Sequence, residues 1–174
     1  MNKIGFIIPV IVFLLYTTRT FSQEKSLKIG HLNVVEIVSA LPESDSAQLL
    51  LENDAKELEE MLENMQVELN NLENDFASNR EAFSDLIRKT KESEILDMRG
   101  KIYNFQQNAQ QQLQQRNFEL LQPIYEKVQN AIDKIATRDS FTYILDVSKG
   151  LVVFTSSNSQ DISTLVLQEL GVEN

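Results

Sequence analysis

The 174-residue chain contains no cysteine, no tryptophan and a single histidine, His31. Without cysteine it can form no disulfide, no thiol nucleophile and no cysteine-ligated zinc site. One histidine also rules out a histidine-rich metal centre and leaves no defensible Ser-His-Asp arrangement. The five glycines are scattered, so the sequence has no phosphate-binding loop of the GxGxxG kind. We therefore assign no catalytic residue, no metal ligand and no cofactor, and we expect a protein that is not an enzyme.

Acidic residues outnumber basic ones by 26 to 16, which gives a formal net charge of −10. Nucleic-acid binding depends on the neutralisation of phosphates, so this balance argues against a nucleic-acid partner. Residues 43–75 alone hold eleven acidic side chains and one basic side chain, Lys56. We interpret this segment as mainly a solvated helix face, because no calcium loop of the DxDxDG kind accompanies it.

Residues 1–22 have the features of a secretory signal peptide. Lys3 gives a positive start, an apolar run extends from Ile4 to Tyr16, and a polar stretch follows. The run is shorter than the roughly 20 apolar residues that span a bilayer; an uncleaved membrane anchor is the alternative. We expect cleavage near residue 22 and a soluble, exported mature protein.

A heptad pattern runs through the middle of the chain. Apolar residues recur there at alternating spacings of four and three, at Leu51, Ala55, Leu58, Leu62, Met65, Leu69, Leu72 and Phe76. This spacing predicts a helix with a coiled-coil seam. A second seam comprises Ile95, Met98, Ile102, Phe105, Ala109, Leu113, Asn117, Leu120 and Ile124. Its consecutive steps of four at 105–113 form a stutter that locally unwinds a coiled coil, and Pro123 predicts a kink.

The two seams are more consistent with an antiparallel hairpin than with one continuous helix over 45–137. The pattern falters near its midpoint, around residue 90, and Ser84 and Asp85 are helix-capping residues. We expect residues 44–137 to form a helical-hairpin arm with its apex near 84–92.

Both ends of the mature chain are expected to form a small base. Alternating polar and apolar residues predict a strand at 27–33 that includes His31, and a C-terminal β-hairpin with strands at 141–147 and 151–155. Asp161 is positioned to cap a last helix, whose apolar stripe is Ile162, Leu165, Val166 and Leu170. The fold class is thus α+β but mostly α, with an association domain built from 23–43 and 138–174.

Three strands per chain leave sheet edges unpaired, and a slender arm has little stability of its own. Strand pairing between subunits would pair these edges and add stability to the arm, so we expect an oligomer. The residues assigned to its contacts are Ile29, Leu32, Ile144, Leu145, Val147, Leu151 and Val153.

Several segments together resemble the OmpH-like (Skp) family of periplasmic chaperones. They are residues 28–34, 102–111, 120–132 and 141–146, followed by 161–167, behind a signal peptide. The resemblance implies a jellyfish-like homotrimer, in which the bases form a body and three hairpins hang as tentacles around a cavity. It also implies an ATP-independent holdase that keeps unfolded outer-membrane β-barrel proteins, or secreted proteins, from aggregating.

A holdase needs reachable apolar surface rather than a catalytic group. The side chains assigned to client contact are Met61, Val67, Phe83, Leu86, Ile87, Leu96, Met98 and Tyr103, although Phe83 and Met98 are also suited to packing between the arms. Residues 80–101 hold six basic and five acidic side chains, and a transient contact of this basic tip with a membrane surface is a further expectation. The alternative function is a structural or adaptor coiled-coil protein of the cell envelope that binds one folded partner.

Overall fold

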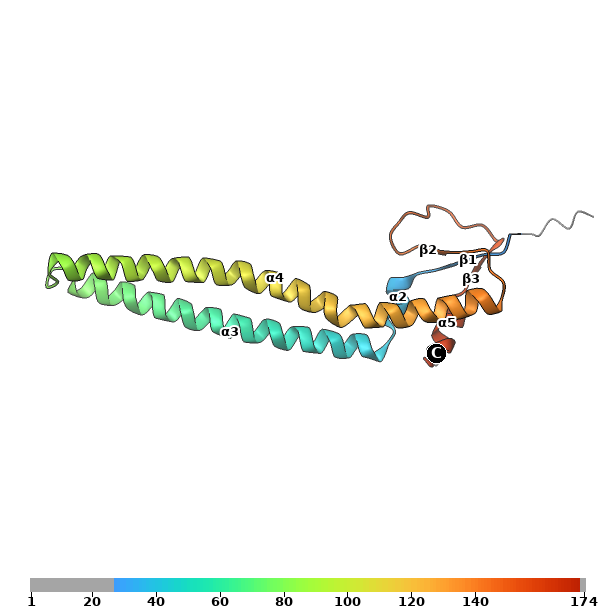
Figure 1. Ribbon diagram of the computed structural model, residues 1–174, viewed down its shortest axis with the longest axis horizontal. Helices are drawn as coiled ribbons and strands as arrows, with labels where there is room; N and C mark the ends of the chain where they lie inside the picture. Colours follow the sequence, from blue (N-terminus) through green and yellow to red (C-terminus); the bar gives the residue numbers. More distant parts are fainter. Residues whose placement is uncertain (1–26, 173–174) are drawn as a thin grey trace, which may run out of the picture.

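The computed structural model describes residues 27–172, so the expected signal peptide at residues 1–22 lies outside the described residues. The elements in chain order are β1 (Ile29–Leu32), α2 (Val34–Ser39), α3 (Pro42–Asn79), α4 (Asp85–Arg138), β2 (Tyr143–Asp146), β3 (Ser159–Asp161) and α5 (Ser163–Glu169). Figure 1 shows α3 and α4 running side by side as a long hairpin that projects from a small base. The expected fold class is confirmed: a long antiparallel helical hairpin on a small strand-containing base.

The arm consists of α3 and α4 joined by a short turn. α3 starts at Pro42, where the missing amide costs little because the first amides of a helix have no intrahelical partner. Ser84 caps α4, since its hydroxyl accepts a hydrogen bond from the Ile87 amide at 3.4 Å. The turn occupies residues 80–84, several residues before the centre of the expected apex at 84–92, because this cap starts the second helix at once.

The seam of the arm follows the heptad pattern over most of its length. Every seam residue of α3 from Leu51 to Phe76 is buried or half-buried. The outer part of the arm closes around a cluster, called the outer cluster, of Leu69, Ile95, Met98 and Ile102, against which Leu62, Met65, Leu72 and Phe76 pack. Asn117 is exposed, so its assignment to the seam is wrong, and Arg116 is half-buried instead. The stutter explains this change, because it shifts the later contacts around the helix.

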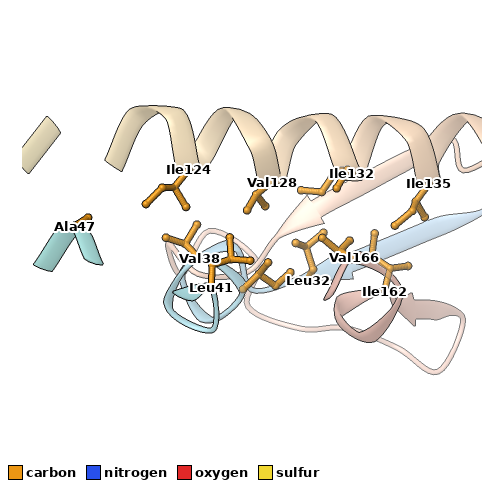
Figure 2. Close-up of a cluster of buried hydrophobic side chains, with 12 residues drawn as sticks. Leu32, Val38, Leu41, Ala47, Ile124, Val128, Ile132, Ile135, Ile162 and Val166 are labelled. Carbon is orange, nitrogen blue, oxygen red and sulfur yellow. The ribbon is translucent and has the colours of Figure 1, made fainter. Parts of the chain in front are cut away.

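The base is held together by an apolar core to which both ends of the described chain contribute. Figure 2 shows side chains of α4 pointing toward those of β1, α2 and α5. The side chains with at most 1% exposure are Leu32, Ile37, Leu41, Val128, Ile135, Ile162 and Val166. Because α4 runs without interruption from the turn into this base core, it forms part of both the arm and the base.

α4 contains Pro123 in its interior. Proline has no amide to donate to the Glu119 carbonyl, and its ring crowds the preceding turn, so a bend is expected at this point. Figure 1 shows α4 changing direction where its colour passes from yellow to orange, which is the part of the helix around this proline.

The base contains a three-stranded parallel sheet with the order β2-β1-β3. The expected C-terminal β-hairpin is therefore wrong. Residues 151–155 form no strand but lie in a loop over 147–158, and the third strand is the polar segment β3. β2 instead pairs in parallel with β1, β3 takes the other edge of β1, and the outer edge of β2, where 151–155 would have returned, carries no strand among the described residues.

Asp146, at the end of β2, connects the sheet to the start of α2. Its carboxylate accepts hydrogen bonds from the Val34 amide at 3.3 Å and from the amide and hydroxyl of Ser148 at 2.9 Å each. Partial burial acts to raise the pKa of Asp146, but these donors outweigh it and hold the pKa below its usual value. The folded state thus stabilises the ionised form of Asp146.

The last helix, α5, closes the base core. The Asp161 carboxylate accepts a hydrogen bond from the Ser163 amide at 2.9 Å, and so provides a partner for an amide in the first turn of α5. The N-cap position itself is Ile162. This amide is the main reason why the pKa of Asp161 lies below its usual value. Gly171 follows the helix with a φ of +79°, a conformation that suits glycine at a helix end. Within residues 27–172, none of the helices has the length and apolarity to cross a membrane.

Candidate functional site

The described part of the chain, residues 27–172, has no group of three or more His, Cys, Asp or Glu side chains that could hold a metal ion. His31 lies half-buried in β1, with its Nδ1 atom 2.8 Å from the Ser159 hydroxyl of β3. This contact joins two neighbouring strands, which is a structural role. Among the described residues, exposed apolar side chains lie on both the arm and the base.

Most of the side chains assigned to client contact are exposed. Exposed residues of this set are Met61, Val67, Leu86, Ile87, Leu96 and Tyr103, and Leu86 has the highest exposure, 76%. Phe83 is half-buried at the turn. Met98 is only 7% exposed in the outer cluster, so its assignment to an exposed contact is wrong. The cause is its position in the second heptad seam, which faces the other helix.

These exposed side chains fall into separate groups rather than one continuous patch. Leu96 and Tyr103 are seven residues apart on α4, so they share one face of the helix two turns apart. Leu86 and Ile87 lie together in the first turn of α4, at the tip of the arm. The arrangement offers several small apolar contacts along the arm, which suits an extended occupant better than a compact one.

Basic side chains surround the apolar residues at the tip. Arg88 is half-buried, donates to the Phe83 carbonyl oxygen at 3.4 Å, and lies 3.6 Å from the Asp85 carboxylate. Lys91 lies 3.2 Å from Glu94 and also contacts α3. The hydrogen bond to Glu94 is the main reason why the pKa of Lys91 is raised. This ion pair therefore favours the charged form of Lys91.

Ion pairs join the two helices along the arm, each with its carboxylate on α3 and its cation on α4. In residues 27–172 the crossing pairs are Glu43 with Lys127, Asp54 with Arg116 (2.9 Å), Glu73 with Arg99 (2.6 Å) and Asp75 with Lys91 (3.6 Å). Exposed pairs of this kind contribute only about 0–1 kcal/mol each. Their common orientation nevertheless favours the pairing of α3 with α4 over the pairing of two acidic α3 helices. Part of the acidic face that we expected to be solvated thus has a structural use.

The two helices do not close completely between the outer cluster and the base core. No side chain in residues 48–68 of α3 or in 103–123 of α4 is fully buried. A groove of about 610 Å³ lies in this interval, and we call it the mid-arm groove. Its apolar lining residues are Leu58, Met61, Phe105 and Leu113, and its charged lining residues are Asp54, Glu57, Arg116 and Glu119.

The base exposes an apolar loop next to a sheet with open edges. In the loop over 147–158, Leu151, Val153 and Phe154 are 84%, 96% and 80% exposed. The outer strands β2 and β3 each pair on one side only within the described sheet. Exposed apolar patches often mark interaction sites.

The residues assigned to subunit contact differ in their exposure. Leu145, Leu151 and Val153 are exposed, whereas Ile29, Ile144 and Val147 are half-buried. Leu32 is 1% exposed in the base core, so its assignment to a subunit contact is wrong. β1 is the central strand of the sheet, and Leu32 has no surface left to offer to a partner.

Several exposed apolar side chains were missed by the sequence analysis. They are Leu27, Val35, Leu49, Leu50, Phe118, Tyr125, Tyr143 and Phe154. For Phe118 a signal was available, since it lies outside the seam of α4. For Phe154 the expectation of a paired return strand concealed its exposure.

The described residues define an elongated helical-hairpin protein, with exposed apolar side chains on its arm and on its base. The chain belongs to the family described as outer membrane protein (OmpH-like), whose model matches residues 28–170. It is 26% identical over 147 residues to the chaperone protein Skp of Pectobacterium atrosepticum, covering 82% of this chain and 85% of the relative. It is 27% identical over 155 residues to the chaperone protein Skp of Yersinia enterocolitica, covering 84% and 87%.

Proposed function

We propose that this chain is an ATP-independent holdase chaperone of the periplasm, which binds unfolded outer-membrane β-barrel proteins and prevents their aggregation. Membership of the OmpH-like family and the similarity to chaperone proteins named Skp support this role. The expected signal peptide at residues 1–22 supports export to the periplasm.

The observation that carries the proposal is the series of exposed apolar side chains along the arm. A protein with one folded ligand gathers its apolar contacts in one patch, whereas these contacts are spread over α3 and α4. The 38 residues of α3 extend over roughly 57 Å at ~1.5 Å per residue. An unfolded chain exposes apolar side chains over comparable lengths, and small contacts at many places hold it without selecting one sequence.

The functional form of the proposal is a homotrimer, in which the bases associate and the arms surround a cavity. The exposed segment 151–155 and the open edges of β2 and β3 support association through the base. Leu151, Val153 and Phe154 would be covered by strand pairing between subunits. The holding cavity would then lie between arms from different copies.

The proposal is tested by diluting a urea-denatured outer-membrane β-barrel protein into buffer with and without the mature chain, and recording light scattering. We expect suppression of scattering at a small excess of trimer. The double variant Leu96→Ser/Tyr103→Ser is expected to suppress less, while the control Gln107→Ser/Gln111→Ser, with polar exposed residues on the same helix, retains full suppression. Unchanged aggregation at several-fold excess of the wild-type chain would contradict the holdase.

An affinity pull-down from an envelope extract separates the holdase from an adaptor. The holdase is expected to retain many outer-membrane proteins, each only when unfolded. Retention of one folded protein in a fixed ratio would instead support the structural or adaptor function.

The basic tip is proposed to contact a membrane surface transiently. Leu86 and Ile87 are exposed there beside Arg88 and Lys89, a combination that favours an anionic lipid surface. Co-sedimentation with vesicles that contain phosphatidylglycerol, compared with vesicles of phosphatidylcholine alone, measures this contact. Equal recovery with both would contradict it.

A further inference from the structure

The mid-arm groove exists because the packing of the seam changes at this level. Phe105 and Leu113 frame the stutter of α4 and are only half-buried. The next contact across the arm is made by Arg116, whose Nε donates to Asp54 at 2.9 Å where an apolar side chain would close the seam. The volume of about 610 Å³ is within the ~300–1,000 Å³ of ligand sites.

The charges around the groove are unequal. Arg116 and Asp54 neutralise each other, which leaves Glu57 and Glu119 as uncompensated charges of the lining. Glu119 accepts a hydrogen bond from Gln115 at 2.9 Å, and neither glutamate has a lysine or arginine partner among the described residues. The groove thus combines an apolar lining, including the exposed Met61, with a net negative charge.

We infer that the mid-arm groove binds segments of unfolded polypeptide that carry a large apolar side chain next to a lysine or arginine. The apolar side chain occupies the space between Leu58, Met61 and Phe105, and the flanking cation lies near Glu57 and Glu119. Segments rich in acidic residues are excluded by repulsion, which the chain's net charge of −10 reinforces. This inference rests on the proposed function and adds to it a rule for the segments that the arm selects.

The test uses the full mature chain and two short, unstructured peptides of equal length. One has a tryptophan flanked by arginines, and the other has the same tryptophan flanked by glutamates. Because the chain has no tryptophan, peptide fluorescence reports binding without background. We expect the basic peptide to bind at least about fivefold more tightly, with a preference that falls as salt increases.

Two charge variants locate this preference. Glu57→Gln/Glu119→Gln removes the uncompensated charges of the groove, and Glu59→Gln/Glu63→Gln removes two exposed charges of α3 that do not line it. The net charge changes equally in both. We expect the preference to fall by about threefold or more in the first variant only. Equal affinities of the wild-type chain for the two peptides, or equal losses in both variants, would overturn the inference.

A quenching experiment places the peptide directly. The chain has no cysteine, so a nitroxide label is attached to a single new cysteine, either Gln112→Cys in the groove or Gln66→Cys on α3 outside it. Tryptophan quenching is expected with the first label and not with the second, and the reverse pattern would overturn the assignment.

Aggregation assays on the same samples keep the two proposals apart. Full suppression of β-barrel aggregation without any peptide preference would overturn the groove and leave the holdase intact. Absence of suppression by the wild-type chain would contradict the holdase itself, and the peptide data would still decide the groove.

Discussion

Arg116 of α4 donates from its Nε atom to the Asp54 carboxylate of α3 at 2.9 Å, across 62 positions of sequence. Both side chains are only partly exposed. They meet between the outer cluster and the base core, at a level that neither apolar cluster reaches. A polar contact thus takes the place of a buried apolar layer and fixes the relative position of the two helices at mid-arm.

A double-mutant cycle measures this contact. Arg116→Gln, Asp54→Asn and the combined variant are compared by urea unfolding, and we expect a coupling free energy of about 0.5–1 kcal/mol. The value is modest because solvent screens a partly exposed pair. A coupling free energy near zero would show that the contact has no part in holding the arm together.

Truncation in the base core is expected to be far more costly than truncation on the arm surface. Ile135 is 0% exposed, so Ile135→Ala should lower the free energy of unfolding by about 2–5 kcal/mol, through lost burial and the cavity left behind. The control Leu96→Ala, at an exposed position of the same helix, should change it by less than about 0.5 kcal/mol. Unfolding followed by circular dichroism at fixed protein concentration measures both free energies. Similar losses of stability in the two variants would contradict the assignment of Ile135 to the core.

A charge in the exposed loop of the base should prevent association of the proposed trimer. Val153 is 96% exposed in the single chain, so Val153→Asp is expected to leave the subunit folded while placing an unpaired carboxylate in the subunit contact. Light scattering with size-exclusion chromatography should then give the mass of one chain. Ile144→Asp is expected to have the same effect but is less informative, because Ile144 also packs against the base core.

Leu96→Asp is the matched control for this experiment, since it introduces the same charge on the arm. It should keep the mass of the wild-type protein. A wild-type mass for Val153→Asp would remove the loop from the association surface.

Acid is expected to destabilise the base through Asp146. Because the donors from Ser148 and Val34 hold the folded-state pKa below the usual 3.8, the unfolded chain binds a proton more readily than the folded chain. The contribution of Asp146 is therefore complete above pH values near the unfolded pKa, and it is lost as the pH falls through the folded pKa.

Urea midpoints recorded from pH 6 down to acid values measure this contribution. Asp146→Asn keeps the shape of the side chain but cannot ionise, so its midpoint should fall less steeply with decreasing pH than that of the wild type. Parallel curves for the two proteins would assign the acid sensitivity to other carboxylates.

The sequence was sufficient to predict the arm, because the period of the pattern is a local property of the helix. The seam from Leu51 to Phe76 faces α4, and the Ser84 cap starts the second helix. The sheet was predicted less well, since alternation identifies a strand but not its partner. The segment 151–155 has strand-forming residues and yet forms no strand, while the polar β3 pairs with β1. The mid-arm groove was also beyond prediction, because a stutter shows where a seam unwinds and not which side chain then crosses it.

The bend of α4 at Pro123 gives the arm a mechanical property. The 38 residues that separate Asp85 from Pro123 form a lever of roughly 57 Å at ~1.5 Å per residue, so a pivot of about 10° sweeps the tip through about 10 Å. In the proposed trimer, a small adjustment at this bend would therefore widen or narrow the space between the arms and fit it to guests of different size.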